Sequence, residues 1–242
     1  TQCCSGMDNI EIDATKIKSG QANVILAGGV ESFSRAPLRA RLNKKNKYVP
    51  YTQAKFSPFH LPNSDIFSQM DHILRDKSVS FKEQCQLAIE SHRKAKEWNH
   101  PDIVPFDFEN ISVYSDTFTR SLNYKTCVKA NGKKNNLNPC LIANRADGSA
   151  FSVLMSKEYF NKKKINSFAL KIKSWQQFGY DPRFPANIPK NVFGKTFPEN
   201  CHFDQIEWME SFASQYLLNK NTFNLPHTTT NPYGGMIAMG HP

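Results

Sequence analysis

Apolar residues recur at helical spacing near the start of the chain and then give way to a short unbroken apolar run. A helix is predicted over residues 7–20, with Gly20 as its end. Its apolar positions lie three or four residues apart: Met7, Ile10, Ala14 and Ile17. The run at residues 22–27 contains β-branched residues and predicts a buried strand, followed by a tight turn at Gly28-Gly29.

Two further helices are predicted from periodicity and capping signals. Residues 80–98 begin with Ser80 and Glu83 at capping-box spacing. They place five residues on one face: Phe81, Cys85, Ala88, His92 and Ala95. A third helix is predicted over residues 204–218, because Asp204 and Glu207 resemble another capping box. Its common face contains Ile206, Met209, Ala213, Tyr216 and Leu217.

Strands are predicted at residues 151–155, 168–175 and 236–239, the last one leading directly into Gly-His-Pro. Prolines break up residues 38–69 and 182–198, so neither segment supports a long helix. Residues 101–138 look irregular, with an exposed Asn- and Lys-rich loop at their end. The alternation of helices and strands predicts an α/β layered fold.

Length and composition fit a globular protein. The 242 residues suffice for one large domain or two small ones. With 39% hydrophobic and 12% aromatic residues, wholesale disorder is not expected. No run approaches 18 apolar residues, so no membrane span is expected, and the first residues do not resemble a signal peptide.

The charge distribution is uneven, and its meaning stays open at this point. The formal net charge is +10, and residues 38–63 contain six basic residues and no acidic one. Such an excess suits an anionic partner such as a phosphate, a nucleic acid or an acidic lipid surface. It is equally typical of a solvated, lysine-rich surface.

Six cysteines are scattered along the chain, which favours a reducing compartment over a disulfide framework. Neither a CxxC nor an HxxxH pair occurs, so a structural zinc site has little support. The pair Cys3-Cys4 directly precedes the first predicted helix, whose N-terminus favours a thiolate. A histidine, His241, follows the last predicted strand. A cysteine nucleophile with a histidine base is one interpretation, and two ordinary structural residues is the other.

Blocks of residues along the whole chain resemble motifs of the thiolase family, in the family's order. Cys3-Cys4-Ser5-Gly6-Met7 is similar to the C-x-S-G-[LM] nucleophile motif. The segment at residues 27–37 is similar to AGG-x-E-S-M-S-x-x-P, and residues 231–242 to N-x-x-GG-x-I-A-x-GHP. Shorter similarities lie at residues 80–84, 91–95, 144–150 and 207–215.

The resemblance implies a fold and an assembly. Thiolases have a five-layered α-β-α-β-α fold built from two similar halves, and they form homodimers or tetramers. We expect residues 1–37 to be the remainder of the N-terminal half. Residues 38–156 would form the substrate-covering loop region and the return to that half, and residues 157–242 the start of the C-terminal half. The fold would thus be incomplete at both termini, since the family has elements before the nucleophile and a C-x-G cysteine after Gly-His-Pro.

The resemblance also implies an activity, that of an acyl-CoA C-acyltransferase in fatty acid metabolism. The acyl group passes between 3-ketoacyl-CoA and CoA through a thioester on Cys3, which His241 activates. Cys4 is the competing position, but the motif places Cys3 first. Coenzyme A is then a substrate rather than a permanently bound cofactor, and no metal is expected. The default location is the cytoplasm.

Five residues are expected at the substrate. Arg39 and Arg41 are candidate partners of the coenzyme A phosphates. Phe212, Ala143 and Met209 occupy motif positions that line the site in the family. Two of them depart from the pattern, because the family has an asparagine where Met209 stands and a serine where Ala143 stands. The asparagine holds the water that binds the thioester oxygen, so its loss predicts a weaker oxyanion site.

Met209 has an alternative interpretation as a core residue on the helical face shared with Ile206 and Ala213. The departures also support an alternative for the whole protein, a degenerate thiolase-like subunit that binds acyl-CoA or is structural. The intact Cys3 and His241 speak against it, and a downstream C-x-G cysteine would discriminate. Nucleic-acid binding through the net positive charge is a third possibility, but the sequence has no recognition motif for it.

Overall fold

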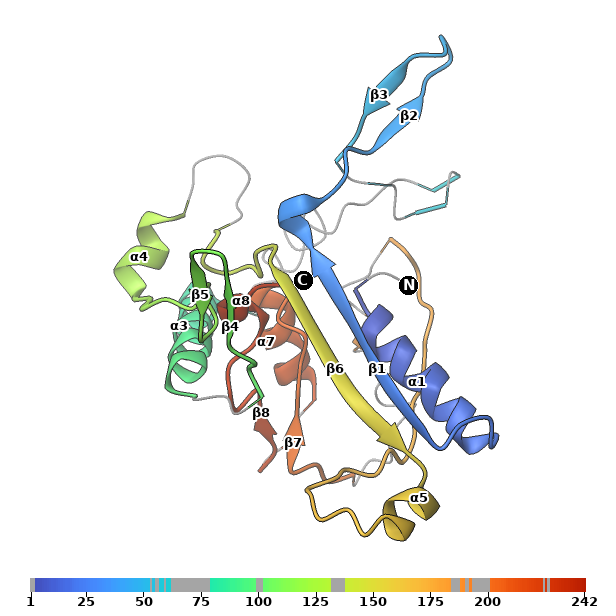
Figure 1. Ribbon diagram of the computed structural model, residues 1–242. Coiled ribbons are helices and arrows are strands. Elements are labelled where there is room, and N and C mark those ends of the chain that lie inside the picture. Colours follow the sequence, from blue (N-terminus) through green and yellow to red (C-terminus); the bar gives the residue numbers. More distant parts are fainter. Residues whose placement is uncertain are drawn as a thin grey trace. The chain divides into compact units, whose positions relative to one another are not determined.

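The computed structural model describes two compact units of mixed helices and strands (Figure 1). The first unit contains residues 1–36, 146–177 and 242, and the second contains residues 37–145 and 178–241. The residues described are 3–52, 54, 57–58, 60–61, 79–98, 102–131, 138–183, 188–189, 192, 201–223, 225 and 227–242.

The first unit is a two-stranded antiparallel ribbon with a helix packed against it. Its strands are β1 (Val24–Ser32) and β6 (Asp147–Met155), paired from Val24↔Met155 to Ser32↔Asp147. The helix α1 (Ser5–Lys18) contacts β1, and Ala14 and Ala27 are buried. The predicted first helix and the predicted strand at residues 151–155 are therefore confirmed. The short elements η1 (Phe33–Arg35) and α5 (Lys157–Lys162) follow β1 and β6, and α5 was not predicted.

The predicted turn at Gly28-Gly29 is wrong, because β1 continues straight through both glycines. Gly28 lies opposite Phe151 in the ribbon. A Cβ at Gly28 would overlap the carbonyl oxygen of Ala150 and the ring of Phe151, whereas a Cβ at Gly29 would meet nothing. Glycine is thus needed at residue 28 for close approach of the strands rather than for a turn.

One face of this ribbon is apolar and exposed. Leu26 pairs with Val153, and Gly28 pairs with Phe151, so these side chains share a face. Leu26, Val30, Phe151 and Val153 are between 57% and 76% exposed. The opposite face, which includes Ala27, faces α1. The alternation along both strands is that of a sheet with one covered face.

The second unit is organised around helix α3 (Phe81–Glu97), which contacts α4 (Tyr124–Lys129), α7 (Ala213–Thr222) and α8 (Met236–Met239). The capping box predicted at Ser80 and Glu83 is present, with both reciprocal hydrogen bonds. The predicted face is also right, since Cys85, Ala88 and His92 are buried. The core of this unit consists of Cys85, Ala88, Cys127, Cys140, Leu141, Ala213 and Ile237.

Three small two-stranded sheets complete the second unit. They are the antiparallel hairpins β2 (Ala40–Leu42) with β3 (Tyr48–Pro50) and β4 (Phe106–Phe108) with β5 (Ile111–Val113), and the parallel pair β7 (Gln205–Ile206) with β8 (Thr229–Thr230). The hairpin β4–β5 and helix α4 lie in the segment predicted to be irregular.

Two predicted strands are wrong, and one predicted helix has the wrong start. The helix predicted over residues 204–218 begins only at Ala213, because Ile206 pairs with Thr230 in the parallel sheet and Asp204 caps nothing there. The strand predicted at residues 236–239 is the short helix α8. Residues 168–175 form no strand, and Phe168 and Leu170 are 88% and 81% exposed. Residues 53, 55–56, 59 and 62–69 of the proline-containing segment 38–69, and most of residues 184–200, lie outside the described residues.

Candidate active site

Cys3 and Cys4 lie at the start of α1 in the first unit, and both are exposed. Cys4 is the N-cap residue, and its carbonyl oxygen accepts the first helical hydrogen bond from the N–H of Asp8 at 3.0 Å. The first N–H groups of a helix have no intrahelical partner and attract negative charge. Cys3 therefore lies directly before the N-cap of α1, and its role as a nucleophile stays a prediction.

Three other cysteines are poor candidates for a nucleophile. Cys85, Cys127 and Cys140 are buried in the core of the second unit. Burial raises the pKa of Cys127 to about 12, and neighbouring thiols add to the effect. Burial also raises the pKa of Cys85. Because the thiolate is the reactive form, these thiols behave as small apolar core residues.

His241 is held by its backbone against the segment at residues 141–145 in the second unit. The N–H of His241 donates to the carbonyl oxygen of Asn144 at 2.7 Å, and Arg145 and His241 form a parallel bridge. The side chain is half-buried, and its Nδ1 is buried with no hydrogen-bond partner among the described residues. These contacts hold the histidine through its backbone.

The same segment brings two other predicted substrate residues close to His241. Ala143 donates its N–H to the carbonyl oxygen of Ser211 at 3.0 Å, and Ile142 forms an antiparallel bridge with Phe212. Phe212 is 6% exposed and stands at the N-cap of α7. The segment at residues 141–145, which includes Ala143, therefore forms backbone contacts with both Phe212 and His241 within the second unit.

Met209 does not lie in the core. It is 43% exposed and stands in the irregular segment before α7, so its interpretation as a core residue on a helical face is wrong. The predicted face does not exist at this position, because Ile206 belongs to β7 and the helix begins at Ala213. An exposed methionine presents no strong hydrogen-bonding group to the site.

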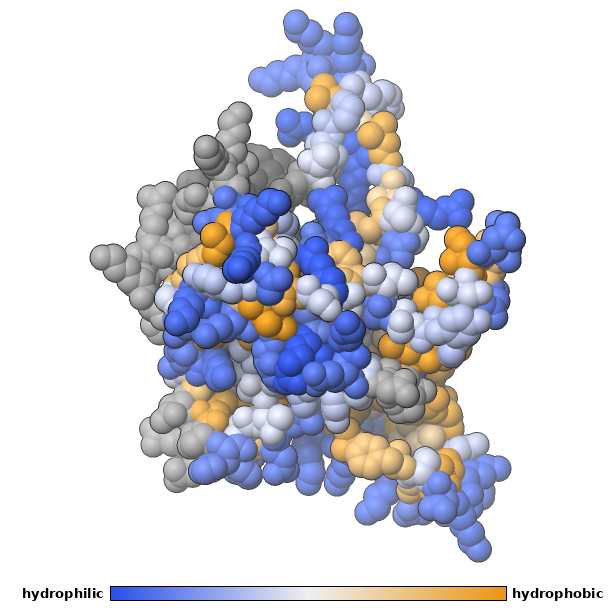
Figure 2. Space-filling view, turned by 90° about the vertical axis from the view of Figure 1, so that its left-hand side faces the viewer, coloured by the Kyte–Doolittle hydropathy of each residue, from blue (hydrophilic) through white to orange (hydrophobic). Residues whose placement is uncertain are grey.

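Arg39 and Arg41 belong to the hairpin β2–β3, and all residues from Pro37 to Pro50 are exposed. The tip is polar, and Asn43 accepts hydrogen bonds from the N–H groups of Lys45 and Lys47 through its side chain. Figure 2 shows this hairpin at the top, with a hydrophilic tip. It presents basic side chains to solvent in a way that suits phosphate groups.

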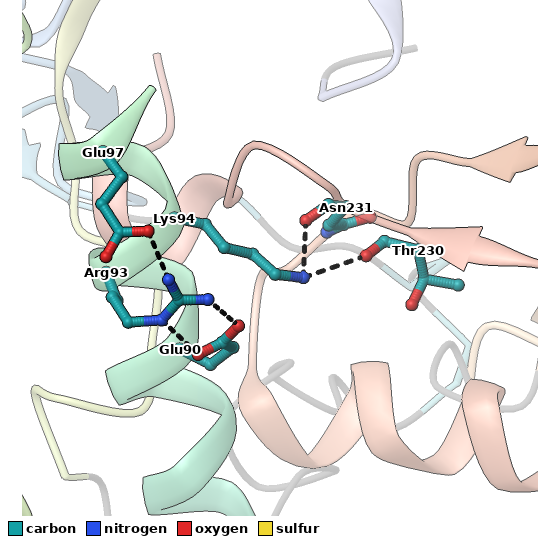
Figure 3. A network of polar contacts seen from close by, with 6 residues as sticks. All are labelled: Glu90, Arg93, Lys94, Glu97, Thr230 and Asn231. Carbon is teal, nitrogen blue, oxygen red and sulfur yellow. Dashed lines mark hydrogen bonds and ion pairs between the residues drawn. The ribbon is translucent and has the colours of Figure 1, made fainter. Parts of the chain in front are cut away.

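A buried polar cluster close to α8 was not among the features predicted from the sequence. Its centre is Glu210, which is 1% exposed and accepts hydrogen bonds from Ser91 and Asn231. Lys94 of α3 donates to the carbonyl oxygens of Thr230 and Asn231, at 3.4 and 3.1 Å (Figure 3). In the sequence, Glu210 is visible only as a glutamate of the motif at residues 207–215. Its burial was not predicted.

His92 is a second buried polar residue of α3, and it is 1% exposed. Its Nδ1 accepts a hydrogen bond from the N–H of Arg120 at 3.3 Å, so the ring proton of the neutral form lies on Nε2. Nε2 is buried without a partner among the described residues. Burial lowers the pKa of His92 to about 4, with a smaller contribution from the charge of Arg120.

The low pKa of His92 predicts a loss of stability in acid. In the unfolded chain the ring takes up a proton near pH 6.5, but in the folded chain only near pH 4. The stability from the neutral ring is therefore present above pH 6.5 and lost as the pH falls toward 4, by about 3 kcal/mol. We expect His92→Gln to flatten this part of the pH dependence in urea denaturation between pH 4 and 8. His227→Gln, at an exposed position, should leave it unchanged. An equal slope in wild type and His92→Gln would contradict the assignment.

Neither a metal site nor a membrane span is present in the part of the chain that the structure describes. Among the described residues, no group of three or more His, Cys, Asp or Glu side chains is arranged to hold a metal ion. No helix within the described ranges is both long and apolar enough to span a bilayer.

The chain is similar to two proteins of Staphylococcus aureus. One is named probable acetyl-CoA acyltransferase and is 24% identical over 272 residues, which cover 99% of this chain and 67% of that protein. The other is named putative acetyl-CoA C-acetyltransferase VraB and is 24% identical over 260 residues, which cover 100% and 67%.

Two solved structures share the fold. The Bacillus anthracis acetyl-CoA acetyltransferase has a TM-score of 0.78 at 21% identity, and the alignment covers 99% of this chain and 66% of that one. The dimeric peroxisomal thiolase of Saccharomyces cerevisiae has a TM-score of 0.75 at 22% identity, with coverage of 99% and 64%. The chain thus spans about two thirds of the length of these relatives, and the predicted thiolase-like α/β fold is confirmed.

Two family models match the chain one after the other. The thiolase N-terminal domain matches residues 1–158, and the thiolase C-terminal domain matches residues 163–242. Together they account for nearly every residue, in the order expected from the motifs. The chain belongs to the thiolase family.

Proposed function

We propose that the protein containing this chain is an acyl-CoA C-acyltransferase that uses Cys3 as its nucleophile. The observation that carries this proposal is the position of Cys3, exposed at the start of a helix, while Cys85, Cys127 and Cys140 are buried. The two relatives, named as a probable acetyl-CoA acyltransferase and a putative acetyl-CoA C-acetyltransferase, support the same reaction class.

The proposed reaction proceeds in two steps. The Cys3 thiolate attacks the 3-keto carbon of a 3-ketoacyl-CoA, and the bond between C2 and C3 breaks. Its electron pair moves to C2, which takes up a proton to give acetyl-CoA, while the acyl group stays on Cys3 as a thioester. The thiol of a second coenzyme A then attacks that thioester, forms acyl-CoA and returns the Cys3 thiol. A covalent intermediate divides one difficult transfer into two easier ones.

His241 is proposed as the base that takes the proton of the Cys3 thiol. Its backbone is fixed by the hydrogen bond to Asn144, and its side chain is half-buried. A histidine suits this role because its ordinary pKa lies close to neutral pH. Cys3 and His241 belong to different units, so their approach to one another is part of the proposal.

Coenzyme A is proposed as a substrate, and the hairpin β2–β3 is proposed to contact its phosphates. Arg39 and Arg41 are exposed there, and the segment around them contains no acidic residue. Arginine binds phosphate oxygens in pairs, which favours it for this contact. Phe212 and Ala143 are proposed to border the acyl and pantetheine parts, from the segment that holds His241.

The remaining parts of the proposal concern assembly and context. The peroxisomal thiolase of Saccharomyces cerevisiae, which shares the fold, is dimeric, and this supports a homo-oligomer here. A role in fatty acid metabolism follows from the proposed substrate. The domain division at residues 37 and 156, and a location in the cytoplasm, stay predictions.

The test is intact-protein mass spectrometry of the full-length protein after incubation with acetoacetyl-CoA and acetyl-CoA. We expect one acyl adduct, which peptide mapping places on Cys3. Cys3→Ser should remove the adduct or convert it to a slowly formed ester, whereas Cys4→Ser, at the neighbouring exposed thiol, should retain it. An adduct lost with Cys4→Ser and kept with Cys3→Ser would move the nucleophile by one position. A folded protein without any adduct would overturn the proposal.

A catalytically degenerate acyl-CoA-binding or structural subunit is the second candidate. The exposed Met209, at the position where the family carries an asparagine, favours it. In that case coenzyme A esters would bind and shift the melting temperature, but no acyl group would remain on the protein. The two candidates are therefore separated by the same mass-spectrometric measurement.

A further inference from the structure

The carboxylate of Glu210 is buried and surrounded by hydrogen-bond donors. It accepts from the Ser91 hydroxyl at 2.8 Å, from the Asn231 side-chain amide at 2.8 Å and from the N–H of Ile237 at 3.3 Å. Burial raises the pKa of Glu210, and these three hydrogen bonds act against that effect. Every one of these partners offers a hydrogen to the carboxylate.

The direction of these hydrogen bonds favours the ionised form. The Ser91 oxygen itself accepts a hydrogen bond from the N–H of Gly235 at 3.0 Å, so the Ser91 hydroxyl hydrogen points to Glu210. The side-chain nitrogen of Asn231 and the backbone nitrogen of Ile237 can only donate. A proton on the carboxyl group would displace one of these donors. A carboxylate with several donors is the arrangement that stabilises a buried negative charge.

The same cluster ties helix α3 to the segment that leads into α8. Lys94 binds the carbonyl oxygens of Thr230 and Asn231 from one face of α3, as Figure 3 shows. Trp98, one turn further along α3, stacks on Tyr233 with ring centroids 4.0 Å apart. Ser91, Lys94 and Trp98 follow the spacing of one helical face. Their contacts therefore hold residues 230–235 along the length of α3.

Two glycines in this segment leave no room for side chains. A Cβ at Gly234, where φ is +82°, would overlap the carbonyl oxygen of Ser91. A Cβ at Gly235 would overlap the carboxylate of Glu210. The N-terminus of α8 is thus in direct contact with the carboxylate and fixed to α3.

Helix α8 is short, and His241 follows it after Gly240. The N–H of His241 is fixed to Asn144. The position of the histidine also depends on α8, which precedes it in the chain. The start of α8 is bound to Glu210 directly by the N–H of Ile237, and indirectly by the N–H of Gly235, which donates to Ser91. Thr119 adds a hydrogen bond to the carbonyl oxygen of Ala238 at 3.3 Å.

We propose that Glu210 is a positioning residue for His241, acting through Ser91, Asn231 and the start of α8. The proposal rests on the role of His241 as the base that activates Cys3. Glu210 itself touches neither the nucleophile nor the substrate in this assignment. Its charge fixes the backbone that carries the histidine, so its loss changes the orientation of the imidazole.

The test compares Glu210→Gln with the matched control Glu207→Gln, an exposed residue three positions earlier, in the full-length protein. The glutamine amide has one acceptor oxygen in place of two, so at least one donor of the cluster loses its partner. We expect the rate of Cys3 acylation by acetoacetyl-CoA to fall about 10- to 100-fold in Glu210→Gln, with KM changed less than about twofold. The control should match the wild type.

A second readout does not depend on catalysis. The ring nitrogen shifts of His241, assigned in ¹⁵N-labelled protein by comparison with His241→Asn, report its tautomer and surroundings. We expect them to change in Glu210→Gln and not in Glu207→Gln. Shifts and rate that equal the wild type in folded Glu210→Gln would overturn the positioning role and leave a purely structural one.

The two proposals fail in different ways. If wild-type Cys3 is not acylated, the proposed function fails, while the histidine shifts still test Glu210. If Glu210→Gln does not fold, Ser91→Ala provides the same test, because it removes one donor to Glu210 and the acceptor of the Gly235 N–H. Unchanged His241 shifts in folded Ser91→Ala would then contradict the proposal.

Discussion

Replacing His241 with asparagine should lower the rate at which Cys3 is acylated by about 10²- to 10⁴-fold. The asparagine keeps a polar side chain of moderate size but has no basic nitrogen to take the thiol proton. The backbone hydrogen bond from residue 241 to Asn144 is retained, so the fold should be little affected. The measurement is quenched-flow mass spectrometry of the Cys3 thioester with acetoacetyl-CoA.

The matched control is His227→Asn. His227 is exposed, and its φ of +71° is a backbone conformation that asparagine tolerates well. We expect this variant to acylate at the wild-type rate. If His241→Asn also reached that rate, another group would have to be the base, and the proposed role of His241 would be lost.

Replacing Met209 with asparagine should raise the rate of acyl transfer by about 10-fold or more. The resemblance to thiolases implies that an asparagine at this position holds the water that binds the thioester oxygen. Loss of one oxyanion donor typically costs about 10²–10³ in rate, which bounds the gain from restoring it. Met209 is 43% exposed and outside any helix, so the substitution should change the stability little. Steady-state kinetics of acetoacetyl-CoA thiolysis measure the effect.

Met209→Leu is the control, since leucine has a similar size and no hydrogen-bonding group. We expect it to match the wild type. Equal rates for the asparagine and leucine variants would show that position 209 does not contribute to the oxyanion site. An inactive wild type that becomes active only in Met209→Asn would instead support the degenerate subunit as the natural state.

The helices α1 and α3 were predictable because their signals are local. In α3, Ser80 and Glu83 form the capping box within one turn, and the buried residues repeat at helical spacing. The start of the next predicted helix at Asp204 is wrong for the opposite reason, although the helix exists from Ala213 onward. Ile206 pairs with Thr230, a partner far along the chain, and that pairing overrides the local signal.

Short apolar runs were ambiguous in the sequence. The four residues of α8 have the composition of a buried strand, and their helical conformation depends on contacts with Glu210 and α3. In the sequence, Gly28 and Gly29 look like a turn. In the structure, glycine is required at residue 28 because Ala150 and Phe151 of β6, a strand far along the chain, lie too close for a side chain. Only the tertiary structure contains this information.

For the candidate site, motifs indicated two residues of distinctive chemistry, and their roles stay predictions. Cys3 stands at the start of α1, as its position before a helical pattern indicates, and His241 stands in Gly-His-Pro. The supporting cluster around Glu210 was not predicted. A glutamate in an amphipathic pattern normally faces solvent, and nothing local indicates that Ser91 and Asn231 converge on it.

The ribbon of β1 and β6 has a consequence for how the protein is made. The whole stretch from residue 33 to residue 146 lies between the two strands, so this pairing cannot form until β6 has left the ribosome. At a synthesis rate of about 5–20 residues per second, this delay is on the order of ten seconds. Closing so long a loop also slows the pairing itself. Throughout that time the edge of β1 that pairs with β6 lacks this partner, beside the apolar side chains of Leu26 and Val30, which favours binding of the nascent chain by chaperones.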